Sequence, residues 1–360
     1  MPKKNNTITV NKINRIDPEQ MIRCVADFPL QVEEAIRIGT SSPLSITAKG
    51  ITSIVLTGMG GSAIAGDLLR SYLADELPIP FLVNRSYALP ASVDRRSLVI
   101  VSSYSGNTEE TMAAYREAIR RKAPVLCITT GGEAERLAAK HNHSCIKVPP
   151  GLQPRAALGY SFFPLLLALS RTGFIKPRLA DIRETVKALK ATSRIYADPG
   201  NPKNLSLFMA KRLHGKLPII YSASERLDAV NVRWRGQICE NSKHLAFGHV
   251  LPEMNHNEIV GWNVDRQLMK KMAVVFLRDK GTHPRVRLRE EVTKGIIQRY
   301  ASVVLEAQSE GKSLLARMFS LIYLGDWVSY YLAILNNEDP TPVKVIDFLK
   351  GELAKEQSES

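Results

Sequence analysis

The sequence predicts an α/β protein with two domains, each a mainly parallel sheet flanked by helices. The chain has 360 residues, about twice the length of a typical single domain. In its first half, three short apolar runs each end in a polar turn that leads into a helix-like segment. Alternation of nearly all-apolar strands with helices is typical of a parallel sheet covered on both faces. The second half repeats this alternation of strands and helices, although its amino-acid sequence has little similarity to that of the first half. We therefore expect domains at residues 1–195 and 203–360.

The first half supplies the elements of the predicted first sheet. Residues 17–38 have a helical pattern, with Asp17 as the cap before Pro18. Strands are expected at residues 51–57, 97–102 and 125–129, and helices at residues 63–73, at residues 109–121 and, after the third turn, up to residue 141. The three polar turns meet at the carboxyl edge of a parallel sheet, which is where such sheets bind ligands.

The second half follows a turn-rich segment at residues 192–202. Strands are expected at residues 217–222 and 274–277, and helices at residues 226–242 and 314–335 and, from the Asp-Pro-Thr-Pro segment that begins at residue 339, through residue 350. Residues 292–306 also have a helical character, which predicts a helix there, although residues 300–304 contain a short β-branched stretch.

The composition excludes several classes of protein. Hydrophobic residues make up 44% and charged residues 23% of the chain, which is ordinary for a globular protein and excludes a wholly disordered one. Four cysteines lie far apart with no C-x-x-C pair, which argues against a structural zinc site or a disulfide framework and fits a reducing cytoplasm. The basic N-terminus lacks the apolar core of a signal peptide. The longest apolar stretch, residues 162–169, is interrupted by a proline and is too short to span a bilayer.

The net charge of +14, from 49 basic and 35 acidic residues, suggests an anionic partner. That partner would be nucleic acid or a phosphorylated metabolite. Much of the excess lies in residues 266–299, but the chain has no zinc-finger spacing, no RNA-binding signature and no Arg-rich tract interleaved with aromatic residues. Two interpretations stay open: a solvated basic surface, and a field that steers an anionic substrate.

Two neighbouring turns have the composition of a phosphate-binding site. Ser103, Ser105 and Thr108 lie between a strand and a helix, so their hydroxyls and the free amides of the helix N-terminus could bind a phosphate together. Capping of the helix is the alternative role for these residue types. At the adjoining edge, Gly60 and Gly61 would let the backbone approach a ligand, and Ser62 adds another hydroxyl.

A dinucleotide site is not expected at this glycine-rich turn. Its sequence GMGGSA has Ala63 where the G-x-G-x-x-G motif has its third glycine, a substitution that some dinucleotide folds tolerate, so the spacing alone does not exclude NAD. The acidic residue that would follow the next strand is also missing, because residues 83–85 read Val-Asn-Arg. No G-x-x-x-x-G-K-[ST] sequence is present either.

Three residues outside these turns are candidates for chemistry. Arg155 immediately precedes a mostly apolar helix, where its charge is unfavourable for the helix dipole; it is either a surface arginine or a cation aimed into a cleft. Glu240, near the end of a helix, and His256, in the loop that follows, suit proton transfer. A metal site is not expected at His244, His249, Glu253 and His256, because their spacing is not that of H-E-x-x-H.

Five motifs together resemble the bifunctional phosphoglucose/phosphomannose isomerases, a family with two sugar isomerase (SIS) domains. They are GMGGSA, SYSGNTEET, the PRAA segment at Arg155, the ENSKH…EMNHNE block and the terminal DPTPV. The resemblance covers almost the whole chain. SYSGNTEET alone would mark only an SIS domain, which also occurs in sugar-phosphate-sensing regulators, whereas the ENSKH block is much more specific.

The resemblance implies a role for each candidate residue. Ser62, Ser103, Ser105 and Thr108 resemble the phosphate-binding hydroxyls. Glu240 resembles the base that moves a proton between C2 and C1, Arg155 the cation beside the enediolate, and His256 the group that helps to open the sugar ring. Lys350 resembles the terminal-helix lysine of the family, although Lys344 lies on the same segment. In this family the site forms between two copies, with the histidine donated by the partner chain, so a homodimer is implied.

The sequence therefore predicts a metal-independent isomerase that interconverts glucose 6-phosphate and mannose 6-phosphate with fructose 6-phosphate in the cytoplasm, without a cofactor, nucleic acid or membrane partner. Removal of a proton next to a carbonyl needs a base in a site that excludes water. Two alternatives remain. One is a non-catalytic regulator that binds sugar phosphates, and the other is a metal-dependent hydrolase that uses His244, His249 and His256.

Overall fold

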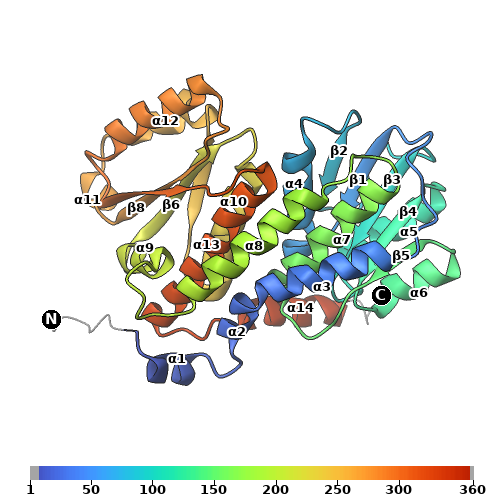
Figure 1. Ribbon diagram of the computed structural model, residues 1–360, viewed down its shortest axis with the longest axis horizontal. Helices are drawn as coiled ribbons and strands as arrows, with labels where there is room; N and C mark the ends of the chain where they lie inside the picture. The colour runs from blue at the N-terminus through green and yellow to red at the C-terminus, as the bar shows by residue number, and fades with distance from the viewer. Residues whose placement is uncertain (1–7, 357–360) are drawn as a thin grey trace.

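The computed structural model describes residues 8–356 and contains two parallel sheets, one in each half of the chain (Figure 1). The strand order is β2-β1-β3-β4-β5 in the first sheet and β7-β6-β8-β9 in the second. In both sheets the first strand of the half, β1 or β6, lies between the next two, so the direction of winding reverses there. Such a reversal opens a crevice at the carboxyl ends of the strands. The predicted fold class, two α/β units with parallel sheets, is confirmed.

The first sheet has five short strands, of which the three central ones are almost entirely buried. Its strands are β1 (Ser53–Thr57), β2 (Phe81–Asn84), β3 (Ser97–Ser102), β4 (Val125–Thr129) and β5 (Ser144–Lys147). Every residue of β3 and β4 is buried, as expected for central strands that are covered on both faces. Its helices are α4 (Gly60–Leu73), α5 (Glu109–Arg120), α6 (Gly132–Lys140) and α7 (Leu158–Arg171), with the short η1 (Pro154–Ala156) before α7.

The N-terminal segment, which the sequence predicts to be helical around residues 17–38, is divided into three helices. The helices are α1 (Val10–Ile16), α2 (Met21–Ala26) and α3 (Phe28–Ser41). Asp17 does cap a helix, because its carboxylate accepts hydrogen bonds from the amides of Met21 and Ile22 at 2.7 and 2.9 Å. The chain breaks between α2 and α3 because Pro29 stands at the start of α3, and a proline has no amide to continue the preceding helix.

The second half contains four strands and most of the remaining helices. The strands are β6 (Leu217–Ala223), β7 (Phe247–Leu251), β8 (Met272–Arg278) and β9 (Val303–Gln308). Helix α8 (Leu179–Tyr196) ends the first half, and the helical elements after it are α9 (Leu205–Leu213), α10 (Asp228–Ser242), η2 (Glu253–His256), η3 (Glu258–Gly261), α11 (Arg266–Met269), α12 (Pro284–Ile297), α13 (Leu314–Asn336) and α14 (Lys344–Glu356). Helix α8 therefore extends into the segment at residues 192–202 that the sequence predicts to be turn-rich.

The helix predicted for residues 292–306 is wrong. Helix α12 ends at Ile297, and residues 303–308 form strand β9 at the edge of the second sheet. Val303 and Val304 pair in parallel register with Ala273 and Val274 of β8. The β-branched stretch that the sequence shows here therefore belongs to a strand, since β-branched residues pack well on a pleated sheet.

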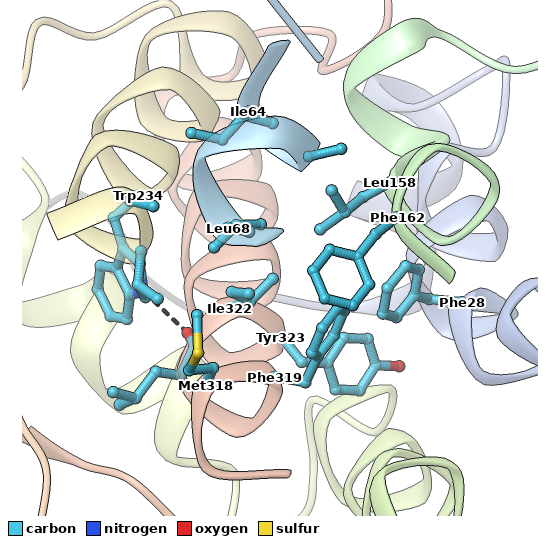
Figure 2. Packing of buried hydrophobic residues seen from close by; sticks show 14 of the residues in the cluster. Phe28, Ile64, Leu68, Leu158, Phe162, Trp234, Met318, Phe319, Ile322 and Tyr323 are labelled. Atoms are coloured by element: carbon cyan, nitrogen blue, oxygen red, sulfur yellow. Dashed lines mark hydrogen bonds between the residues drawn. The ribbon is translucent and has the colours of Figure 1, made fainter. Parts of the chain in front are cut away.

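Helix α13 is the common core of the two halves. It is long and apolar enough to span a membrane by length and composition alone, but 94% of that stretch is buried inside the protein. Figure 2 shows its residues Phe319, Ile322 and Tyr323 between Trp234 of α10 on one side and Phe28 of α3 on the other. One contiguous hydrophobic cluster includes residues from both halves. The two halves are therefore packed against each other, which fixes helix α10 against α4 of the first half.

Candidate active site

The predicted phosphate-binding hydroxyls converge at the carboxyl edge of the first sheet. We call Ser62, Ser103, Ser105 and Thr108 the hydroxyl cluster. The Oγ of Ser62 accepts a hydrogen bond from the amide of Tyr104 at 3.2 Å, which joins the turn after β1 to the turn after β3. The hydroxyls of Ser103 and Thr108 lie 3.1 Å apart. Ser62 and Ser103 are buried, whereas Ser105 is exposed.

Free helix amides accompany these hydroxyls. Helix α4 begins at Gly60 without a side-chain cap, and the amides of Gly60 and Gly61 donate to no acceptor among residues 8–356. The side chain of Thr108, which precedes α5, forms no capping hydrogen bond. Unpaired amides at a helix N-terminus, next to neutral hydroxyl donors, form a favourable site for a phosphate group. Thr108 thus does not cap α5, whereas the hydroxyls of Ser103 and Ser105 accept hydrogen bonds within their turn, from the amides of Gly106 at 3.1 Å and Asn107 at 3.3 Å.

Gly61 and Gly106 are required for close packing of the turns around this edge. A Cβ atom on Gly61 would lie 2.4 Å from the carbonyl oxygen of Pro154 in η1. Gly106 has a φ of +73°, and a Cβ there would lie 1.9 Å from the carbonyl oxygen of Gly131. The first contact places η1, and with it Arg155, directly against the start of α4.

Arg155 is held by two separate segments of the chain, the end of α10 and the loop after α13. Its Nε donates to Oδ1 of Asn241 at 2.6 Å, and its Nη2 donates to the carbonyl oxygens of Pro340 and Thr341, both at 2.7 Å. Its Nη1 lies 3.6 Å from Oε2 of Glu240. Only 3% of the Arg155 side chain is exposed, so Arg155 is a buried cation and not a surface arginine.

The guanidinium of Arg155 keeps its charge in a buried place. Burial lowers the pKa of Arg155, and the nearby carboxylate of Glu240 opposes that change. An arginine remains charged even so, because its ordinary pKa is far above neutrality. Glu240 is the sole carboxylate that pairs with it among residues 8–356. Because its other acceptors are neutral, the positive charge of Arg155 interacts mainly with Glu240 and with any anion bound beside it.

A buried network fixes the backbone of Arg155 from behind. Nη2 of Arg233 donates to the carbonyl oxygen of Arg155 at 3.1 Å and to Oδ2 of Asp326 at 2.8 Å. Burial raises the pKa of the Asp326 carboxyl, and Arg233 opposes that change. Gln237 donates to the second oxygen of Asp326 at 3.0 Å. Helices α10 and α13 thus position η1 as well as Glu240.

Glu240 itself stands in the last turn of α10 with 32% of its side chain exposed. It is therefore accessible to a ligand while it lies beside a fixed cation. Helix α10 packs on α4, and η1 lies between Glu240 and the glycine-rich start of α4 through the contacts of Arg155 and Gly61. Arg155 therefore pairs with Glu240 and lies, through η1, against the start of α4, the helix that carries Ser62.

His256 and Lys350 are not brought to this place within one chain. His256 ends η2 on an exposed surface, and Lys350 is exposed on α14. Neither side chain forms a hydrogen bond or ion pair with any residue in the range 8–356. Lys344, the alternative to Lys350, is likewise exposed. Leu245, Phe247, Val260 and Val264, from β7, η3 and their adjoining loops, are large apolar side chains that are also exposed.

Two residues that contact the site were missed from the sequence. Asn241 accepts from Arg155 and donates to Oγ of Ser329 at 2.9 Å. Lys243 donates from Nζ to the backbone carbonyl oxygens of Glu240 at 2.8 Å and Pro340 at 3.1 Å. Both lie within three positions of Glu240 in the ENSKH motif, which is the signal that could have identified them.

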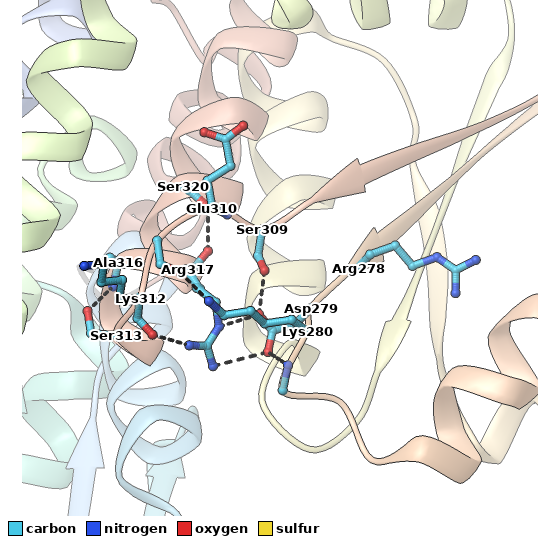
Figure 3. Close-up of polar contacts among 12 residues, drawn as sticks. Arg278, Asp279, Lys280, Ser309, Glu310, Lys312, Ser313, Ala316, Arg317 and Ser320 are labelled. Carbon is cyan, nitrogen blue, oxygen red and sulfur yellow. Dashed lines mark hydrogen bonds and ion pairs between the residues drawn. The ribbon is translucent and has the colours of Figure 1, made fainter.

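The carboxyl edge of the second sheet is arranged differently. Asp279 follows β8, and its carboxylate accepts hydrogen bonds from Oγ of Ser309 at 2.5 Å, Nε of Arg317 at 2.7 Å and the amide of Gly281 at 2.9 Å. Figure 3 shows Arg317 and Ser309 pointing toward Asp279, whereas Arg278 points away. Burial raises the pKa of Asp279, but the bonds from Arg317 and Ser309 outweigh it and lower the pKa overall. An internal carboxylate fills the place where the first sheet offers open donors.

Metal-binding geometry is not found in the part of the chain that the structure describes. No three His, Cys, Asp or Glu side chains of residues 8–356 lie close enough together to hold a metal ion. The set His244, His249 and His256 therefore gives no support to a metal-dependent hydrolase.

Comparison with known proteins identifies both halves of the chain. Residues 49–169 match the SIS domain, and residues 202–353 match the bacterial phospho-glucose isomerase C-terminal SIS domain. A bifunctional phosphoglucose/phosphomannose isomerase from Caldicellulosiruptor bescii is 47% identical over 93% of this chain and 99% of its own length. One from Aquifex aeolicus is 39% identical over 86% of this chain and 93% of its own.

Solved structures show the same fold at lower identity. A glucose-6-phosphate isomerase-like protein from Thermus thermophilus is similar with a TM-score of 0.63 and 18% identity. The similarity covers 92% of this chain and 96% of that one.

Proposed function

The chain belongs to the bifunctional phosphoglucose/phosphomannose isomerase family, and we propose that it interconverts glucose 6-phosphate and mannose 6-phosphate with fructose 6-phosphate at the site between η1, α4 and α10, with Glu240 as the base. The observation that supports this assignment most directly is the 3.6 Å approach of Glu240 to the buried guanidinium of Arg155. A carboxylate next to a fixed cation, open on one side, suits removal of a proton beside a carbonyl group.

The substrate phosphate binds at the hydroxyl cluster and the free amides of Gly60 and Gly61. Ser62, Ser103 and Thr108 supply neutral donors, and the N-terminus of α4 supplies a favourable dipole. The phosphate is remote from the reacting carbons, so its binding energy orients C1 and C2 without taking part in the chemistry.

Glu240 then removes the proton from C2 of the open-chain aldose and returns it to C1. The C–H bond at C2 breaks, and its electrons form the C1=C2 double bond of the enediolate with negative charge on O1. A new C–H bond then forms at C1 while the hydroxyl proton of O2 passes to O1, so that O2 becomes the ketone oxygen. Negative charge that develops on the enediolate oxygens faces Arg155. A fixed donor of this kind typically contributes roughly 3–4 kcal/mol, or about 100- to 1,000-fold in rate.

Glucose 6-phosphate and mannose 6-phosphate differ only at C2, so both give the same enediolate. One base therefore serves both sugars when the site admits both orientations at C2. Thr341, whose carbonyl oxygen accepts a hydrogen bond from Arg155, is our candidate for a residue that lines that space.

Ring opening is assigned to His256, with Lys350 as a second candidate. His256 is exposed and has no partner within residues 8–356, and exposed apolar side chains surround its segment. These features support a homodimer in which a second copy brings its histidine to the site. The free cysteines fit a cytoplasmic enzyme.

A coupled assay with purified protein, fructose 6-phosphate and a chelator tests the function. We expect both glucose 6-phosphate and mannose 6-phosphate to form. Glu240→Gln should lower kcat by about 100- to 10,000-fold, because it removes the base, and leave the affinity for fructose 6-phosphate nearly unchanged.

Two outcomes would contradict different parts of the proposal. Near-full activity of Glu240→Gln would show that another group is the base. Binding of fructose 6-phosphate without turnover of either sugar by the natural chain would support a sugar-phosphate-binding regulator instead.

A further inference from the structure

Lys243 ends helix α10 three residues after Glu240. Its backbone is left-handed, with a φ of 52° and a ψ of 36°, and this conformation ends the helix. The ammonium reaches back over the last turn, where Nζ donates to the carbonyl oxygens of Glu240 at 2.8 Å and Asn241 at 3.4 Å. Taken alone, these two bonds would describe an ordinary helix cap.

A third bond extends this cap to the loop that follows α13. Nζ of Lys243 donates to the carbonyl oxygen of Pro340 at 3.1 Å. The same oxygen accepts from Nη2 of Arg155 at 2.7 Å. Lys243 therefore binds both the backbone of the base, Glu240, and the anchor of the cation, Arg155.

Charged groups face this ammonium from every element around it. They are Glu240 on its own helix, Arg155 on η1, and Glu338 and Asp339 in the loop after α13. Burial, and then repulsion from Arg155, lower the pKa of Lys243 to about 8, although the three carboxylates oppose the change. Lys243 is thus protonated at neutral pH and loses its proton in mildly alkaline solution.

We propose that Lys243 is a positioning residue for the isomerisation, whose ammonium holds the Pro340 carbonyl against Arg155 and the last turn of α10 in place, so that cation and base face each other. This inference rests on the proposed function. It implies that the protonated form is the active one, because loss of the proton removes one donor and the charge that strengthens the other bonds.

Substitution of Lys243 separates this role from that of a helix cap. In Lys243→Met, we expect kcat to fall by about 10- to 100-fold, because a small displacement of reacting groups has such an effect. KM should change little, since the phosphate contacts lie in the first half of the chain. Lys243→Arg keeps the charge and the donors, so it should retain most of the activity.

The pH profile of kcat provides the readout that a purely structural role would not move. When kcat is measured from about pH 6 to about pH 10, the activity of the natural chain should fall as the pH rises, with an apparent pKa of about 8. Lys243→Arg should move this alkaline limb upward, and Lys243→Met should abolish it. Lys216→Met is a matched control, because Lys216 also caps a helix through a backbone carbonyl, that of Arg212 at 3.0 Å.

The outcomes distinguish this inference from the proposed function. Turnover by the natural chain together with an alkaline limb that persists in Lys243→Met would overturn the role of Lys243 alone, as would a Lys243→Met enzyme with an altered melting temperature but an unchanged kcat. If Lys243→Met does not fold, the pH profile of kcat for Lys243→Arg serves as the test. An alkaline limb at the same pH as in the natural chain would overturn the inference. Absence of turnover by the natural chain would instead defeat the proposed function.

Discussion

A buried guanidinium needs acceptors for five N–H groups, and two of the acceptors of Arg155 are backbone carbonyl oxygens. The carbonyl oxygens of Pro340 and Thr341 bind one of its nitrogens, and Asn241 binds another. These contacts occupy the Nε and Nη2 side of the guanidinium. Nη1 is left to face Glu240, so the geometry of the cation is fixed before any substrate arrives, which is the condition for efficient stabilisation of developing charge.

Arg155→Lys should retain the charge but lose this geometry. An ammonium cannot satisfy Asn241 and two carbonyl oxygens in the directions of a planar fork, so we expect kcat to fall by about 100- to 1,000-fold. Steady-state kinetics with fructose 6-phosphate measure the effect, and a thermal melt checks the fold.

Arg171→Lys is the matched control for that variant. Arg171 also donates to two backbone carbonyl oxygens, those of Gly39 and Ser42, both at 2.8 Å, at the end of α7. Its substitution should leave kcat unchanged. Activity of Arg155→Lys close to that of the natural chain would show that a fixed guanidinium is not required.

At this scale, the sequence predicts the residues whose side chains carry a chemical signature. The hydroxyls, Arg155 and Glu240 stand out by type and by motif, and the structure joins Ser62 to the turn after β3 and pairs Arg155 with Glu240. The acceptors at residues 340–341 could not be found in this way, because a backbone carbonyl looks the same in every residue. The roles of His256 and Lys350 stay predictions, since neither side chain contacts the site within one chain.

Among the elements, the start of α4 and the short η1 show how closely two backbones approach each other. Gly61→Ala would place a Cβ 2.4 Å from the Pro154 carbonyl oxygen and 3.0 Å from the amide nitrogen of Arg155. Because both neighbours are backbone atoms, η1 has to move and carries Arg155 with it. We expect kcat/KM to fall by about 100-fold, as measured by the coupled assay.

Gly295→Ala provides the comparison for Gly61→Ala. Gly295 lies within α12, and no atom stands within 4 Å of the position of an added Cβ. The change should therefore leave activity unaltered and raise stability slightly, by up to about 1 kcal/mol, because alanine favours a helix interior. An active Gly61→Ala enzyme would show that the position of η1 is not critical.

Strand β9 and the helix break at Pro29 are two features of the fold that the sequence patterns do not predict. The apolar strands β3 and β4 appear where they are predicted. Strand β9 is an edge strand with only one partner, β8, and most of its residues are only partly buried or exposed. Its short β-branched stretch is a weak local signal, and pairing with β8 is what makes these residues a strand rather than a continuation of helix α12.

The whole molecule has two sheets of the same construction but one open edge. At the second edge, the carboxylate of Asp279 takes the donors of Ser309, Arg317 and Gly281. We therefore expect one sugar phosphate to bind per chain. Titration calorimetry of Glu240→Gln with fructose 6-phosphate measures this number without turnover.

A second variant and a second possible outcome test this number. When Ser103→Ala is added to Glu240→Gln, the single binding event should become weaker, since Ser103 belongs to the hydroxyl cluster. Two binding events per chain would contradict the assignment of Asp279 as an internal occupant of the second edge.

The two halves are joined by more than apolar contacts. Arg70 of α4 pairs with Asp228 of α10 at 2.6 Å. Glu184 of α8 accepts hydrogen bonds from the amides of Lys312 and Ser313 at 2.6 and 3.0 Å, at the start of α13. These bonds lower the pKa of Glu184, so the carboxylate is stabilised in its charged form where it meets the N-terminus of a helix.

The anchor of Arg155 lies almost two hundred residues later in the chain, at residues 340–341. A chain synthesised only as far as the first sheet therefore contains the hydroxyl cluster but not the acceptors that orient the Arg155 guanidinium. We expect the parts of the proposed site to be completed in the order of the sequence, so that Arg155 is fixed opposite Glu240 only after the loop that follows α13 has docked.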